Sequence, residues 1–95
     1  MVRGMELLWW PAADQVMARL EADPATANVL RAVRRTLGRL ERDAYDPRLR
    51  TRQFSTERYG QMRSTPAGAG DWHIMWQAGP GPDQITIAFI AETTL

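Results

Sequence analysis

The spacing of the apolar residues changes near the middle of this 95-residue chain, and this change most limits the folds open to it. Before Asp46, apolar residues recur every three or four positions, as they do along one face of a helix. Beyond Asp46 they tend to recur at every second position, as they do along one face of a strand. Helices followed by a run of strands are typical of an α+β domain.

The first half predicts a short strand and two helices. Residues 5–10 are mostly apolar and end at Pro11, as expected of an opening strand. A helix is predicted over residues 12–21, where the apolar residues have helical spacing: Ala13, Val16, Met17 and Leu20. Asp23-Pro24 can begin a second helix, and Asp46-Pro47 ends it. The apolar stripe of this second helix consists of Leu30, Val33, Leu37 and Leu40.

The second half predicts four strands, over residues 48–54, 59–65, 71–78 and 84–91. The breaks after the second and third of these strands are rich in Gly and Pro, and the first break begins with Ser. We expect the four strands to form an antiparallel meander with the helices packed on one face. Because no long linker divides the chain, a single domain over residues 1–95 is expected.

Composition excludes several classes of protein. The chain has no Cys and one His, so neither a disulfide framework nor a structural zinc site is expected. No cofactor motif is present, because the Gly-rich stretches do not precede a helix. No apolar run is long enough to span a membrane, and the first residues do not resemble a signal peptide. We therefore expect a cytoplasmic protein with no metal, no cofactor and no membrane partner.

The positive charge is concentrated in one part of the chain. Residues 31–63 contain ten Arg and four acidic residues, whereas residues 64–95 contain three acidic residues and no basic one apart from a His. There is no Lys, and the planar guanidinium group of Arg suits bidentate contacts with phosphate or carboxylate groups. This distribution indicates either a polyanion such as RNA or an acidic protein as partner.

The predicted hairpins place these charges on the sheet. A hairpin centred on Gly68 sets Arg63 opposite His73, and a turn at residues 55–58 sets Arg50 opposite Arg63. The last hairpin is expected to pair Trp76 with Ile85, Ile74 with Ile87 and Trp72 with Phe89. With these registers, one set of side chains shares the face away from the helices: Arg48, Arg50, Arg52, Phe54, Tyr59, Gln61, Arg63, His73 and Gln77. A single RNA strand could follow the arginines, with Phe54 and Tyr59 stacking on its bases.

Three short stretches of the second half have the form of sequence motifs that follow one another in a fixed order. They are Tyr59–Arg63 (YGQMR), Asp71–Trp76 (DWHIMW) and Ile85–Ile90 (ITIAFI), and they follow Asp46-Pro47. In order they resemble the motifs "y-R-x-R", "d-y-R-i-x-Y" and "i-x-i-x-x-I" of the RelE/ParE superfamily of bacterial toxins, although the loop over residues 64–70 is longer than the usual turn of that family. The order of the predicted elements resembles that family too.

The resemblance implies the toxin of a type II toxin–antitoxin system. Members similar to RelE cut mRNA in the ribosome without a metal, and a small antitoxin protein neutralises them. Arg63 matches the second arginine of "y-R-x-R", and His73 stands at the arginine of "d-y-R-i", so both are expected to be catalytic. Gln61 stands where the first arginine is often found. The residues expected to contact RNA are Arg48, Arg50, Arg52, Tyr59 and Gln61.

A second function remains open on the same fold. The chain ends at Thr94-Leu95 without the basic or aromatic tail that supplies the general acid in cleaving members. The alternative is therefore a non-catalytic binding module, either a ParE-like gyrase inhibitor or a degenerate toxin that binds an antitoxin. The sequence leaves open whether the chain is an enzyme, and whether it forms a homodimer or a toxin–antitoxin hetero-oligomer. The nuclease hypothesis requires Arg63 and His73 to lie on the same face of the sheet.

Overall fold

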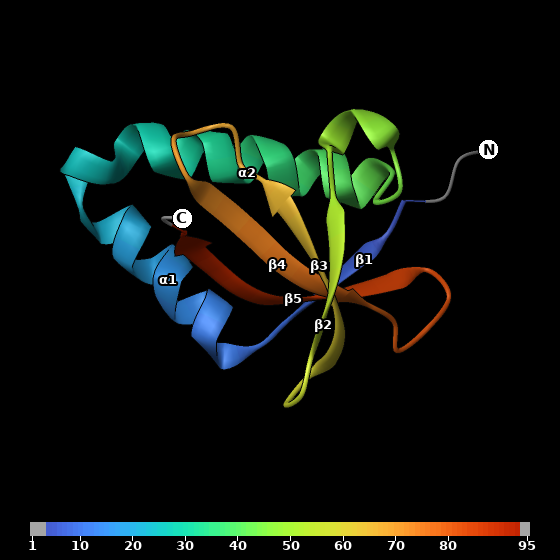
Figure 1. Ribbon diagram of the computed structural model, residues 1–95. Helices are drawn as coiled ribbons and strands as arrows, with labels where there is room; N and C mark the ends of the chain where they lie inside the picture. Colours follow the sequence, from blue (N-terminus) through green and yellow to red (C-terminus); the bar gives the residue numbers. More distant parts are fainter. Residues whose placement is uncertain (1–3, 94–95) are drawn as a thin grey trace.

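The computed structural model describes residues 4–93, which form two α-helices and a five-stranded sheet (Figure 1). The elements are β1 (Glu6–Trp9), α1 (Pro11–Ala22), α2 (Ala27–Arg42), β2 (Arg52–Thr56), β3 (Gly60–Pro66), β4 (Trp72–Ala78) and β5 (Gln84–Glu92). The expectations about a signal peptide and about the end of the chain concern residues 1–3 and 94–95, which lie outside the described residues.

The sheet has the order β1-β5-β4-β3-β2. Strands β2 to β5 form the predicted antiparallel meander, and β1 adds to the other side of β5 as a parallel strand. As a result β2 is one edge of the sheet and β1 is the other. The predicted α+β class is confirmed.

The core lies between the two helices and one face of the sheet (Figure 1). From the predicted apolar stripe of α2, Val33, Leu37 and Leu40 are buried. The sheet contributes an equally apolar set: Ile74, Trp76, Ile85, Ile87 and Ile90. We call this side of the sheet the helix face and the other side the open face. Side chains alternate between them along each strand, and directly paired residues share a face.

The predicted register between β3 and β4 is wrong. Arg63 pairs with Trp76, and Pro66 pairs with His73, so the pairing is shifted by three residues. Because an odd shift exchanges the two faces, Arg63 lies on the helix face and His73 on the open face. This register places Thr65 in the core, where its Oγ1 accepts a hydrogen bond from Trp76 Nε1 (3.0 Å) and lies 2.7 Å from Thr51 Oγ1. The buried hydroxyl is thereby satisfied.

The register between β2 and β3 is shifted in the same way. Arg52 pairs with Ser64 and Gln53 with Arg63. Arg52 and Phe54 therefore lie on the open face with His73, whereas Gln61 lies with Arg63 on the helix-face side. The nine residues predicted to share one face are thus divided between two.

A β-bulge in the last hairpin corrects a further prediction. The pairing of β4 with β5 shifts between Met75 and Trp76. Trp76 pairs with Ile87 rather than Ile85, and Ile74 pairs with Ile90. The bulge leaves Phe89 opposite Met75, on the open face, although the sequence predicted it in the core opposite Trp72.

Residues 48–51 are not part of a strand. Pro47–Leu49 form a single 3₁₀ turn, and the Asp46 side chain caps it by accepting the Arg48 N–H at 2.9 Å. This turn buries Leu49, which is 4% exposed, against the core. An extended segment over residues 48–54 would have pointed its alternate polar side chains inward, so the shorter β2 is the better way to bury Leu49.

Candidate functional site

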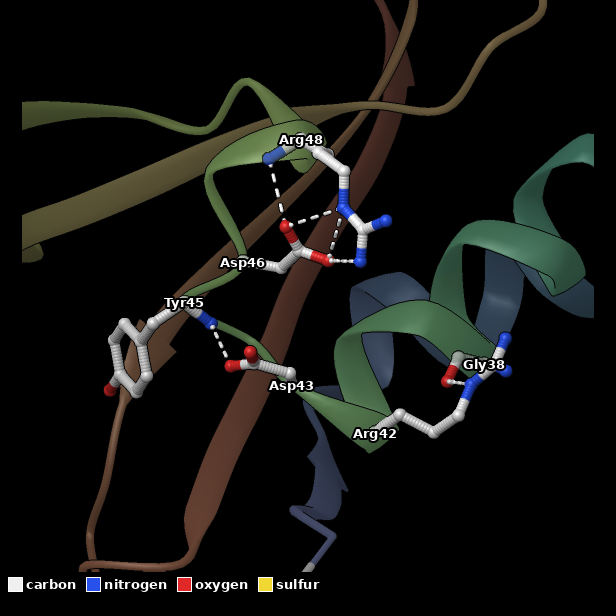
Figure 2. A network of polar contacts seen from close by, with 6 residues as sticks. All are labelled: Gly38, Arg42, Asp43, Tyr45, Asp46 and Arg48. Carbon is white, nitrogen blue, oxygen red and sulfur yellow. Dashed lines mark hydrogen bonds and ion pairs between the residues drawn. The ribbon is translucent and has the colours of Figure 1, made fainter. Parts of the chain in front are cut away.

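The segment between α2 and β2 is held by two aspartates (Figure 2). Asp43 Oδ1 accepts the Tyr45 N–H at 3.1 Å, and Asp46 binds the guanidinium of Arg48 at 2.9 to 3.2 Å. The Arg48 side chain is 83% exposed. Its hydrogen bonds hold the pKa of Asp46 below the ordinary value of 3.8. Arg48, expected to contact RNA, is therefore engaged by a carboxylate of its own chain.

We predict that Arg48→Gln raises the pKa of Asp46 towards 3.8, because the side-chain hydrogen bond from Arg48 is the largest cause of its depression. The backbone N–H of residue 48 still donates, so the pKa will not rise the whole way. In the native protein the pair stabilises the fold above the unfolded pKa and ceases to do so as the pH falls through the folded one. An NMR titration of the Asp46 carboxyl measures the change, and an unaltered midpoint would contradict it.

Arg50 has an unusual backbone conformation that places it between two clefts. Its φ of 57° lies in the left-handed region, which residues other than Gly seldom adopt, and its N–H donates to Pro47 O at 3.2 Å to close the turn. On the open face it lines a cleft of about 340 Å³ together with Arg52, Ser64, Pro66 and His73. We call this the His73 cleft. Arg50 also lines a second cleft of about 380 Å³ beside Tyr45 and Arg63. We call this the Tyr45 cleft.

His73 is held in one orientation by its Nδ1 atom. This nitrogen lies 2.8 Å from the Asp71 carbonyl oxygen and 2.9 Å from Thr93 Oγ1. A carbonyl oxygen only accepts, so Nδ1 must carry the hydrogen in that bond. In the neutral ring the lone pair then resides on Nε2, the nitrogen needed by a general base. Two arginines and an oriented imidazole thus line one cleft.

Arg63 lies on the other face, between two aromatic rings. The centre of its guanidinium is 5.1 Å from the Tyr45 ring and 5.5 Å from the Trp76 ring, within the range of cation–π attraction. With the Gln53 amide oriented to satisfy both groups, its oxygen accepts from Arg63 Nη1 at 2.9 Å and Nη2 at 3.0 Å. Arg63 and His73, predicted to act together, lie on opposite faces of the sheet. A nuclease site that uses both residues, as the sequence predicted, is therefore excluded, and any cleavage at His73 must proceed without Arg63. Gln61 also lies away from His73 and donates to Ser55 Oγ at 2.8 Å.

Tyr59 belongs to a cluster of three aromatic rings at the open face. Its ring centroid is 5.3 Å from that of Trp10 and 5.4 Å from that of Phe89, and Trp10 and Phe89 are 5.5 Å apart. The guanidinium of Arg58 lies 5.4 Å from the Tyr59 ring.

Sequence reasoning missed Tyr45 and Gln53, the two side chains that position Arg63. A signal was present for Tyr45: it is an aromatic residue directly before the Asp-Pro that follows α2, where it lies beyond the apolar stripe. It is 53% exposed, which is high for so large an apolar side chain. Gln53 gave no signal, because its role depends on the register of β2 with β3.

Two further findings concern the described part of the chain. Between residues 4 and 93, no three His, Asp or Glu side chains lie close enough together to hold a metal ion. Within the same range, neither helix is both long and apolar enough to cross a membrane.

Comparison with known proteins identifies the fold. No protein-family model and no curated protein sequence matches the chain. A solved structure does: the YoeB/ParE toxin from Agrobacterium tumefaciens superposes with a TM-score of 0.74, over 95% of this chain and 100% of that one, at 8% sequence identity. The predicted resemblance is thereby confirmed for the fold, and the chain has the α+β fold of RelE/ParE-type toxins.

Proposed function

We propose that the chain is the toxin of a type II toxin–antitoxin system and that it cleaves ribosome-bound mRNA at the His73 cleft without a metal. One observation carries the proposal: an imidazole with an available Nε2 shares a cleft with the guanidinium groups of Arg50 and Arg52. The fold shared with a bacterial toxin supports the toxin assignment. An acidic antitoxin is the expected protein partner, given the concentration of arginine in residues 31–63.

The chemistry needs a base and stabilisation of negative charge. His73 Nε2 takes the proton of a ribose 2′-hydroxyl as its oxygen attacks the adjacent phosphorus. The new O2′–P bond forms while the P–O5′ bond breaks, and the leaving 5′-oxygen takes its proton from water. The products are a 2′,3′-cyclic phosphate and a 5′-hydroxyl. Arg50 and Arg52 would stabilise the additional negative charge on the phosphorus oxygens.

The aromatic cluster extends this proposal along the open face. On β5, Ala91 pairs with His73, and Phe89 pairs with Met75. Phe89 therefore lies two residues along β5 from the residue that pairs with His73. Two residues of a strand span about 7 Å, which is close to the spacing of successive nucleotides. We infer that Tyr59, Trp10 and Phe89 offer a stacking surface for a base beside the cleaved bond.

A non-catalytic binding function is the second candidate, and a specific observation favours it. In-line cleavage uses a general acid as well as a base, and His73 is the single imidazole or carboxyl side chain among the residues that line the His73 cleft. The separation of Arg63 from His73 also removes one expected contributor of charge. On this alternative the chain binds an antitoxin or another protein and cuts nothing.

The test is cleavage of mRNA on programmed ribosomes by the purified chain, with the 5′ ends of the products mapped. Cleavage to 5′-hydroxyl ends, suppressed by a cognate antitoxin from the neighbouring reading frame, supports the toxin nuclease. Intact mRNA together with tight antitoxin binding would replace it with the binding module.

We further predict that Arg50→Gly weakens RNA binding without weakening the fold. Gly adopts a positive φ freely, so relief of backbone strain offsets its greater freedom in the unfolded chain, and the free energy of unfolding should stay within about 1 kcal/mol of the native value. Loss of one phosphate contact should lower the slope of log affinity against log salt by about 0.7. Arg31→Gln, at an exposed position of α2, is the matched loss of charge, and an equal slope change there would contradict a specific role for Arg50.

A further inference from the structure

Arg63 is a cation that lies between two aromatic rings and a neutral amide. Within residues 4–93 its guanidinium forms no ion pair, and its charge faces two aromatic rings and the neutral amide of Gln53. By contrast, Arg34 and Arg48 pair with Glu21 and Asp46. A half-buried guanidinium that is held rigidly and lacks a counter-charge is prepared for an anion, since little side-chain entropy remains to be lost on binding.

The guanidinium keeps donors for a ligand. It carries five N–H groups, and the two hydrogen bonds to Gln53 use one on each terminal nitrogen. Three N–H groups remain, enough for the paired contacts that a phosphate takes from an arginine. Arg50 lines the same cleft and adds a second positive charge.

Tyr45 supplies a flat apolar wall in the same cleft. Its ring is contacted by Arg63 and, edge-on at 6.0 Å, by Trp76, yet the residue is 53% exposed. The Asp43 side chain fixes the backbone of Tyr45 through its N–H (Figure 2). The acidic residue of this cleft, Asp46, is bound by Arg48, which reduces its repulsion of an anion.

We propose that the Tyr45 cleft is a nucleotide-binding subsite, in which a base stacks on the Tyr45 ring and a phosphate binds Arg63 and Arg50. Its volume of about 380 Å³ is within the usual range for small-molecule sites. The choice of RNA as the natural ligand rests on the proposed function, whereas the subsite itself does not depend on His73. Arg50 lines both clefts, so one RNA strand would pass from the His73 cleft around Arg50 to the Tyr45 cleft.

An acidic peptide is the competing ligand, and the exposed ring argues for the nucleotide. A carboxylate would satisfy Arg63 but would leave the Tyr45 ring exposed to water. A nucleotide uses both features, because each base has a face that can stack and each phosphate has oxygens that can accept.

Binding of 5′-AMP, followed by NMR, tests the subsite. We expect shifts in the Trp76 indole N–H, the Gln53 side-chain amide and the Tyr45 backbone signal, and the same shifts in His73→Gln. A short labelled oligoadenylate should bind Tyr45→Ala about 5- to 100-fold more weakly than the native chain. Tyr45→Phe keeps the stacking surface and should bind within about twofold of it. Because Tyr45 is exposed, these variants should fold.

Several results would overturn the subsite. One is a set of AMP shifts confined to Arg50, Arg52 and His73, with Tyr45→Ala binding as the native chain does. Another is an effect of Tyr45→Ala no larger than that of the control Arg31→Gln, which would leave only general attraction of charge. A third is that an oligoglutamate peptide, and not AMP, shifts the Trp76 and Gln53 signals. Absence of mRNA cleavage with AMP still bound at Tyr45 would refute the nuclease and leave the subsite standing.

Discussion

His73→Gln should lower the rate of mRNA cleavage by about 10²- to 10⁴-fold, the usual contribution of a general acid or base. Glutamine keeps a polar side chain near the Asp71 carbonyl but cannot accept the ribose proton. The side chain is partly buried on the open face and does not belong to the apolar core cluster, so the fold should be retained. Single-turnover cleavage of ribosome-bound mRNA measures the rate, and thermal melting checks the fold.

Thr93→Val is the control for orientation. It removes the hydroxyl 2.9 Å from Nδ1 but leaves the Asp71 carbonyl, which accepts from the same nitrogen at 2.8 Å. We expect a loss of no more than about tenfold, because the tautomer is still fixed while the ring has more freedom. If His73→Gln cuts mRNA as fast as Thr93→Val does, the imidazole is not the general base and the His73 cleft is not the cleavage site.

The helices and most of the strands could be predicted because the spacing of the apolar residues indicates which type of element buries them. The stripe of α2 and the alternation along β5 hold in the structure, since burial selects them directly. The parallel pairing of β1 with β5 had no such signal. A short apolar sequence indicates that a strand is buried, but it does not indicate which strand lies next to it. The 3₁₀ turn at Pro47–Leu49 was missed because the arginines around it alternate as they would in a strand.

The candidate site was predicted less well, because it depends on register. The loop between β3 and β4 contains two glycines that adopt positive φ, Gly68 and Gly70. A turn could be centred near either of them, so the sequence alone does not determine the centre of this hairpin. The polarity of β3 does not decide between them. Met62 is apolar, yet it lies on the open face and is buried there, while Thr65 lies in the core with its hydroxyl bonded.

Because the predicted register was wrong, Arg63 and Gln61 lie on the other side of the sheet from His73. Arg52 and His73 share the open face as predicted and line one cleft, whereas Arg63 lies on the helix face in the structure. There the sequence offered no reason for an arginine. Its partners, Tyr45, Gln53 and Trp76, come from three different segments, and their convergence follows from the tertiary fold alone.

Trp76→Ala should destabilise the protein by about 3–5 kcal/mol, the usual range for a fully buried aromatic side chain. Trp76 is 0% exposed, and it joins the apolar core to the polar residues beyond the end of α2. Its loss leaves a cavity beneath Tyr45 and Arg63, and it removes the Nε1 donor of the buried Thr65 hydroxyl. For a domain of this size, the melting temperature should fall by at least about 12 °C.

Trp76→Phe separates packing from the hydrogen bond. Phenylalanine keeps an aromatic face for Arg63, and Thr65 Oγ1 keeps its contact with Thr51 at 2.7 Å, so a loss of about 1–2 kcal/mol is expected. Phe54→Ala, at a residue 37% exposed on edge strand β2, is the control and should change the free energy of unfolding by less than about 1 kcal/mol. If Trp76→Ala melts within a few degrees of Phe54→Ala, Trp76 does not hold the core to the Arg63 region. Arg63 would then lack the rigid aromatic support on which the Tyr45 cleft depends.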